Sequence, residues 1–357
     1  MSNATLESKI ERAFQDDVIF KYPEGTSITQ LHHEFLSERK NALGDVVSTD
    51  GFYQIKEELA FLDKEVMAWH LDTYGSELNK FGKGAEVEAS KERYRNDTRF
   101  KKAFDLFGVD WGQHNTKIYI PWWNEVGASQ ISHEQLPDGG YKASFVPMHP
   151  FELQLVKRGL DLPVKTTSTL GVLVAAPDET SREGYIVLGV RTGSGHANTY
   201  HVVPAGYLQA SGEFIRGEAT IYDGFVKDEV TPESGLTKND ISDVNPLAIV
   251  RDYIISNGGP EYTFLLQSKL NKEQILQKWR EHEGAKDCHE HAEFVFVPAK
   301  KEAVNDFIAK NYVGSVANRP DRKDSERYIL HPAALALASY SGMPLSTLKS
   351  YCNGQEN

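Results

Sequence analysis

Two glutamates spaced four residues apart offer the most specific chemistry in this chain. Glu229 and Glu233 would lie on one face of a helix, because residues at positions i and i+4 are neighbours on a helix surface. Paired carboxylates are hard oxygen ligands that suit Mg²⁺ or Mn²⁺. An ion held there could bridge phosphate oxygens and activate a water molecule for attack. The alternative is an acidic helix surface without a function.

The chain around this pair alternates between short apolar segments and turn-rich stretches, which is typical of strands in a mixed fold. The predicted strands are residues 166–176, 185–190, 200–203, 247–255, 261–268 and 293–297. The predicted helices are residues 225–234, 272–281, 301–311 and 332–341. Both carboxylates therefore belong to a helix that follows three strands.

The first part of the chain has a different pattern. Apolar residues recur at three- and four-residue spacing within residues 52–71, which predicts a helix, and residues 28–42 and 91–106 are also interpreted as helical. We therefore expect a mostly helical domain in residues 1–115. Strands and a helix in residues 116–160 connect it to, or form part of, an α+β domain in residues 161–357.

The segment from Gly206 to Leu236 resembles the Nudix box, G-x5-E-x7-R-E-U-x-E-E-x-G-U, where U is a bulky aliphatic residue. Gly206 fits the opening glycine of this pattern. Glu229, followed by a valine, matches the E-U pair, and Glu233 matches the second glutamate of the E-E pair. Gly235 and Leu236 match the closing G-U. The resemblance extends over roughly residues 160–345 and does not include the first part of the chain.

Four departures separate this segment from the Nudix pattern. Glu213 lies one residue later than the first glutamate of the box, and an insertion within residues 214–225 separates the two halves. Asp228 replaces the arginine, and Pro232 replaces the first glutamate of E-E. Because proline lacks a backbone N–H, the local helix is expected to begin near Pro232 or to kink there.

The resemblance implies a Nudix-like α/β/α sandwich around a mixed sheet, which makes the whole chain an α+β protein. It also implies hydrolysis of a diphosphate linkage in a nucleoside diphosphate-type compound, with Mg²⁺ or Mn²⁺ as cofactor. Glu229 and Glu233 would then be both metal ligands and catalytic residues. The other implied site residues are Glu213 and Glu290 as metal ligands, Glu293 as a catalytic carboxylate, and Arg191 and Gly206 for substrate binding.

Three alternatives stay open. A second alignment places the start of the Nudix helix at residues 245–253, but it puts Ile255 and Ser256 where the glutamates belong, so we prefer the first. A Nudix fold with a decayed box would bind a nucleotide-like ligand or a protein partner without catalysis. A diphosphate isomerase would need a cysteine near the box, and neither Cys288 nor Cys352 is near it in the sequence.

Composition narrows the class of partner. The 357 residues carry 51 acidic and 39 basic side chains, a net charge of −12, so no nucleic-acid partner is expected. Apolar stretches fall short of the roughly 20 residues that span a bilayer, and the N-terminus has no signal-peptide pattern. With only two cysteines, we expect a cytoplasmic protein that acts on a small molecule. The oligomeric state is not predicted.

Overall fold

The computed structural model describes residues 6–60, 97–114, 125–157, 160–192, 198–254, 257–282, 291–312 and 327–352. Contacts divide the chain into two units. The first unit contains Met1–Leu31, Thr167–Leu208 and Ile221–Asn357, and the second contains His32–Thr166 and Gln209–Thr220. The sequence suggested continuous domains with boundaries near residues 115 and 160. In the structure, each unit instead consists of stretches that are separated in the sequence.

The first unit is built on a mixed sheet in which seven strands follow the order β1-β11-β12-β7-β8-β9-β14. Strand β10 pairs with β7, and β13 pairs with β8. The β12–β7 and β14–β9 pairs are parallel, and the others are antiparallel. The strands are β1 (Ile19–Lys21), β7 (Ser168–Ala175), β8 (Tyr185–Arg191), β9 (Thr199–Val202), β10 (Ala205–Tyr207), β11 (Ile241–Asp252), β12 (Gly259–Ser268), β13 (His291–Pro298) and β14 (Tyr328–Ile329).

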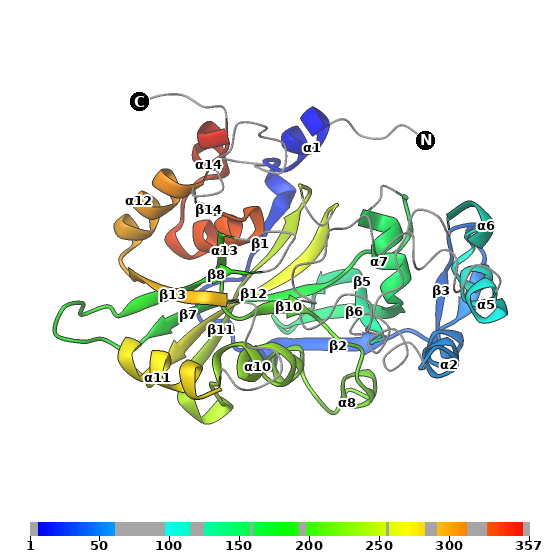
Figure 1. The fold of residues 1–357 in the computed structure, drawn as a ribbon, viewed down its shortest axis with the longest axis horizontal. Helices are drawn as coiled ribbons and strands as arrows, with labels where there is room; N and C mark the ends of the chain where they lie inside the picture. The colour runs from blue at the N-terminus through cyan, green and yellow to red at the C-terminus, as the bar shows by residue number, and fades with distance from the viewer. Residues whose placement is uncertain are drawn as a thin grey trace, which may run out of the picture. The chain divides into compact units, whose positions relative to one another are not determined.

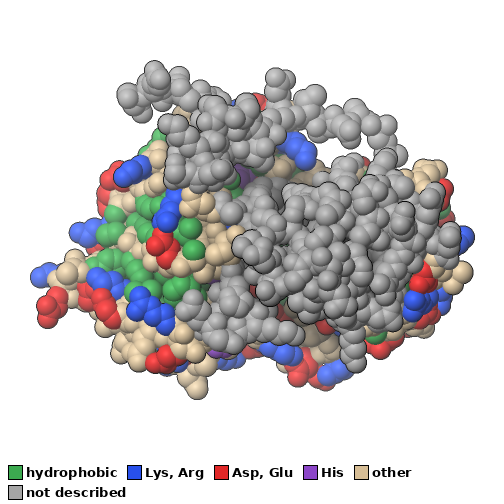
Figure 2. All heavy atoms as spheres, in the orientation of Figure 1, with side chains coloured by type: hydrophobic (Ala, Val, Ile, Leu, Met, Phe, Trp, Pro, Cys, Tyr) green, Lys and Arg blue, Asp and Glu red, His purple; other side chains and the backbone are tan. Residues whose placement is uncertain are grey.

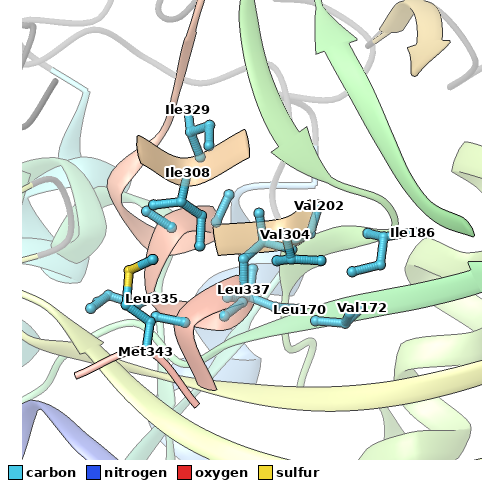
Figure 3. Packing of buried hydrophobic residues seen from close by; sticks show 14 of the residues in the cluster. Leu170, Val172, Ile186, Val202, Val304, Ile308, Ile329, Leu335, Leu337 and Met343 are labelled. Atoms are coloured by element: carbon cyan, nitrogen blue, oxygen red, sulfur yellow. The ribbon is translucent and has the colours of Figure 1, made fainter. Parts of the chain in front are cut away.

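Helices cover both faces of this sheet. Figure 1 shows α12 (Lys301–Asn311) and α13 (His331–Ser341) on one side, and α10 (Thr231–Ser234) and α11 (Lys272–His282) on the other. Figure 3 shows the packing on the α12 and α13 side, where buried Leu337 and Val304 lie close to the strand residues Leu170, Val172 and Ile186. Helices α1 (Leu6–Arg12) and α14 (Leu345–Cys352) complete this unit together with α9 (Ile221–Phe225).

Aromatic pairs attach the helices to the second face of the sheet. Phe225 of α9 stacks on Phe264 of β12, with ring centroids 5.6 Å apart, and Trp279 of α11 stacks on Phe294 of β13 at 4.5 Å. Because cross-strand neighbours share a face, this is also the face of Gly171 and Gly189. The candidate carboxylates lie on this side, in the segment that follows α9.

The second unit contains two small sheets and short helices. The three-stranded sheet has the order β2-β6-β5, and β3 and β4 form a hairpin. Its strands are β2 (Leu31–Phe35), β3 (Glu38–Lys40), β4 (Val46–Ser48), β5 (Gly127–Gln135) and β6 (Tyr141–Met148). The helices that the structure describes in the second unit are α2 (Asp50–Glu58), α5 (Thr98–Phe107), α6 (Trp111–His114), α7 (Pro150–Lys157) and α8 (Gly212–Ile215).

The helix predicted at residues 28–42 is wrong. Residues Ile28–Gln30 form a short 3-10 helix, and the segment then forms β2 and β3, because its apolar and aromatic side chains also alternate at Leu31, His33 and Phe35. His33 and Phe35 both contact the ring of Phe145 in the second unit. The two-residue repeat of these side chains, which is typical of a strand, therefore agrees with the structure. Helices α2 and α5 confirm parts of the predictions at 52–71 and 91–106, whose remaining residues lie outside the described ranges. The described part of residues 1–115 therefore mixes strands and helices rather than being mostly helical.

The α+β class is confirmed, with mixed sheet topology. Of the helices that the structure describes, none combines the length and the apolar character needed to cross a bilayer. Figure 2 shows acidic and basic side chains interspersed among the described residues of one face. The absence of a nucleic-acid partner stays a prediction from the composition.

The insertion between the two halves of the candidate motif packs in the second unit. The Ala210 N–H donates to the carbonyl of Val126 at 2.8 Å. Fully buried Phe214 stacks on His33, with ring centroids 4.1 Å apart, and contacts the rings of Phe35 and Phe145 at 5.4 and 5.6 Å. This aromatic cluster therefore fixes the inserted segment.

We expect Phe214→Ala to destabilise the second unit by about 3–5 kcal/mol, because it empties a fully buried aromatic site. Urea unfolding followed by tryptophan fluorescence measures the change. Phe214→Leu is the matched control and should lose less, since it keeps most of the buried volume. Equal stability of the alanine variant and the native protein would show that the cluster does not anchor the insertion.

Candidate functional site

The carboxylate pair lies on an irregular helical segment. Helix α9 continues into a π-helical turn, η4 (Val226–Val230), and then into α10, which ends at Gly235 with a φ of 71°. Pro232 cannot donate the backbone bond that an α-helix requires, and the Thr231 N–H instead bonds to the carbonyl of Val226. The helix predicted at residues 225–234 is confirmed, as is the irregularity expected at the proline.

Glu229 lies directly against Gly206 of β10. A Cβ atom added to Gly206 would lie 1.9 Å from Glu229 Oε1 and 2.3 Å from Oε2. Only a residue without a side chain leaves space for this carboxylate. Gly206 and Glu229, which match two positions of the same sequence motif, are thus in contact.

Glu233 is buried and lies against the residue before Gly206. Its Oε2 atom accepts a hydrogen bond from the backbone N–H of Ala205 at 3.2 Å. The same oxygen lies 3.3 Å from Nε2 of His291, which is also buried. Two groups from different strands therefore hold one oxygen of this carboxylate.

The two carboxylates converge on one short backbone segment, Ala205–Gly206. Mg²⁺ is commonly held by one or two carboxylates, with water and substrate phosphate oxygens supplying the remaining ligands. Glu229 and Glu233 are oxygen donors of this chemical type. Within the described ranges, no group of three or more His, Cys, Asp or Glu side chains could hold a metal ion. A third protein ligand would have to come from outside those ranges.

A bulge in β13 separates His291 from Glu293. His291 pairs with Arg191 of β8 and Glu293 with Val190, and the register shifts between these two pairs. Because cross-strand partners share a face, His291 lies on the face of Gly189 and Glu293 on the opposite face. There Glu293 forms a partly exposed ion pair with Arg327.

This placement leads to a prediction for Glu293. We expect Glu293→Gln to change the rate of any metal-dependent turnover by less than about twofold, because exposed ion pairs contribute little. Steady-state kinetics of the purified variant measures this. A large drop in kcat at unchanged stability would instead support the catalytic role that the sequence resemblance gives to Glu293.

Among the described residues, the structure does not bring the other candidate site residues together with Glu229 and Glu233. Arg191 ends β8 on the same face as His291 and is partly exposed. Glu213 lies in the first turn of α8, in the second unit. Glu290 lies outside the described residues. The metal-binding roles of Glu213 and Glu290 and the phosphate-binding role of Arg191 stay predictions.

Sequence reasoning missed His291, although a signal for it exists. Gly189 interrupts an apolar strand, and a Cβ atom there would lie 2.3 Å from Nδ1 of His291. A glycine inside a strand often marks the close approach of another group. The alternative motif at residues 245–253 is wrong, because this segment lies in β11 up to Asp252 rather than at the start of a helix.

Comparison with known proteins gives distant matches. No family model matches the chain, and no curated protein matches it. Among solved structures, the chain is similar to the protein DR0079 from Deinococcus radiodurans, with 14% identity and a TM-score of 0.32 over 49% of this chain and 83% of that one. It is also similar to a MutT/nudix family protein from Enterococcus faecalis, with 13% identity and a TM-score of 0.25 over 37% of this chain and 43% of that one.

Proposed function

We propose that the protein is a Nudix-type hydrolase that cleaves a diphosphate linkage in a nucleoside diphosphate-type compound. The proposal rests on one observation, the convergence of Glu229 and Glu233 on the Ala205–Gly206 segment. These residues occupy the metal-binding and loop positions of the motif that the sequence resembles. The helical segment that carries both glutamates lies against Ala205–Gly206 in the folded chain, although an insertion separates the two segments in the sequence.

In this proposal the chain supplies oxygen ligands and substrate contacts. Glu229 and Glu233 would hold a Mg²⁺ or Mn²⁺ ion, and Glu290, which lies outside the described residues, is the candidate for a third ligand. Such an ion supplies charge neutralisation for the diphosphate and lowers the pKa of a bound water. Arg191, at the end of β8, contacts substrate phosphate, since a guanidinium matches phosphate geometry.

A turnover screen tests this function. The purified protein is offered sugar nucleotides, dinucleotide cofactors, dinucleoside polyphosphates and nucleoside triphosphates, each with Mg²⁺ or Mn²⁺. Products are identified by mass. Cleavage at a diphosphate that stops on addition of EDTA supports the proposal and names the substrate class. Absence of cleavage across the panel, in folded protein that binds the metal, would contradict the hydrolase.

The second candidate is a binding module without catalysis. Two observations favour it. Asp228 and Pro232 replace two charged positions of the motif, and Oε2 of Glu233 already accepts two hydrogen bonds within the protein. Nucleotide binding measured by calorimetry, without turnover of the bound compound, would support this candidate.

A further inference from the structure

The imidazole of His291 is held against the backbone of β8. A Cβ atom at Gly189 would lie 2.3 Å from Nδ1 and 2.7 Å from both Cγ and Cε1 of this ring. The ring also meets Phe294 edge-on, with centroids 5.9 Å apart. Since the glycine and the phenylalanine confine the ring, its orientation is set by packing rather than by the hydrogen bond alone.

The two ring nitrogens of His291 have different surroundings. Nε2 lies 3.3 Å from Oε2 of Glu233, and a carboxylate oxygen only accepts hydrogen bonds, so Nε2 is the donor. Nδ1 is buried and has no hydrogen-bond partner among the described residues. A hydrogen on Nδ1 would be a buried donor without an acceptor, which is costly. The environment therefore favours the tautomer with hydrogen on Nε2.

The carboxylate of Glu233 is fixed through one of its two oxygens. Oε2 accepts from His291 at the start of β13 and from the Ala205 N–H at the start of β10. The other oxygen, Oε1, makes no hydrogen bond to any residue that the structure describes. Holding a ligating carboxylate through such outer contacts typically sets its orientation and strengthens metal binding.

We propose that His291 is a positioning residue for Glu233, holding Oε2 so that Oε1 is presented to a divalent cation. This inference rests on the proposed function, because it uses Glu233 as a metal ligand. It adds a residue that the sequence resemblance does not include. The packing of Gly189 and Phe294 around the ring makes the position of the donor reproducible without the metal.

Mn²⁺ affinity of full-length variants tests the proposal. His291→Leu fills similar volume without a donor, whereas His291→Gln retains an amide N–H that can approach Glu233. Electron paramagnetic resonance of free Mn²⁺ gives the dissociation constant of each, and urea unfolding checks that each is folded. We expect His291→Leu to bind Mn²⁺ about 10–100-fold more weakly than the native protein, and His291→Gln to recover most of the loss.

The outcomes separate this inference from the proposed function. The positioning role is overturned if folded His291→Leu binds Mn²⁺ as tightly as the native protein. It is also overturned if His291→Gln loses as much Mn²⁺ affinity as His291→Leu. Native protein that binds Mn²⁺ but cleaves no diphosphate overturns the hydrolase, and the comparison of leucine with glutamine still decides the role of His291. If the native protein binds no Mn²⁺, both are overturned.

A measurement on the native protein covers the case in which His291→Leu fails to fold. Two-bond correlation spectra of ¹⁵N-labelled histidine report which ring nitrogen carries the hydrogen, and the His291→Gln spectrum identifies the signal by its absence. Hydrogen on Nε2 is the expected result. A neutral ring with hydrogen on Nδ1 would overturn the proposal, because Nε2 could not then donate to Glu233.

Discussion

Glu229→Gln should lower metal-dependent turnover by at least about 100-fold, more than is typical for residues that only support metal ligands. The amide has the size of the carboxylate but no negative charge, so it binds a divalent cation poorly. Stability should change by less than about 0.5 kcal/mol, since Glu229 is only partly buried. Initial rates over a range of Mn²⁺ concentrations distinguish weaker metal binding from slower chemistry.

The matched control for Glu229→Gln is Glu302→Gln, which removes an exposed carboxylate in the first turn of α12. It makes the same change in net charge on a helix of the same unit. We expect turnover within about twofold of the native protein. If both variants retain full activity, Glu229 is not a ligand of the metal that turnover requires, and the assignment of the site to the Glu229–Glu233 pair is overturned.

The second large effect is expected for Gly206→Ala. The new methyl group would lie 1.9–2.3 Å from the carboxylate atoms of Glu229, so either that side chain or β10 must move. The φ of Gly206 is not in the left-handed region, and lack of space is therefore the sole obstacle. We expect a loss of turnover close to that of Glu229→Gln and a loss of about 1–3 kcal/mol in unfolding free energy.

A double-mutant cycle tests the origin of this effect. In a Glu229→Ala background the space beside Gly206 is free, so Gly206→Ala should cost much less stability there than in the native chain. Gly224→Ala is the control substitution, because its nearest heavy atom, Leu208 Cδ1, would be 3.7 Å away, an ordinary contact. If Gly206→Ala lowers the unfolding free energy equally in both backgrounds, Glu229 does not occupy the space next to Gly206.

Local patterns were sufficient for much of the fold around the site. The short apolar segments 166–176 and 185–190, which are bounded by turn-rich stretches, predicted β7 and β8. The apolar sequence of α13 predicted a helix that proves to be almost entirely buried. The spacing of Glu229 and Glu233 predicted a shared helical face, and their side chains do converge on one segment. Each of these features depends on residues that are neighbours in the chain.

Local patterns failed where two periods fitted the same residues. In residues 28–42, Leu31 and Phe35 are four residues apart. This spacing places them on one face of a helix, but it also places them on one face of a strand, whose side chains repeat every two residues. Pairing with β6 decided between them, because it places His33 and Phe35 against Phe145. That partner lies far away in the sequence, so no window around the segment contains it.

By itself, the sequence determined the residue types of the candidate site, the helix that carries both glutamates and the strands that precede it. Only the tertiary structure decided which groups meet. It placed Glu229 in the space left by Gly206, and it turned His291 toward Glu233 while Glu293 faces the other side. The physical reason is the bulge in β13, since one register shift between paired strands exchanges the faces of the residues that follow. Such a shift depends on the partner strand and leaves no periodic signal in its own segment.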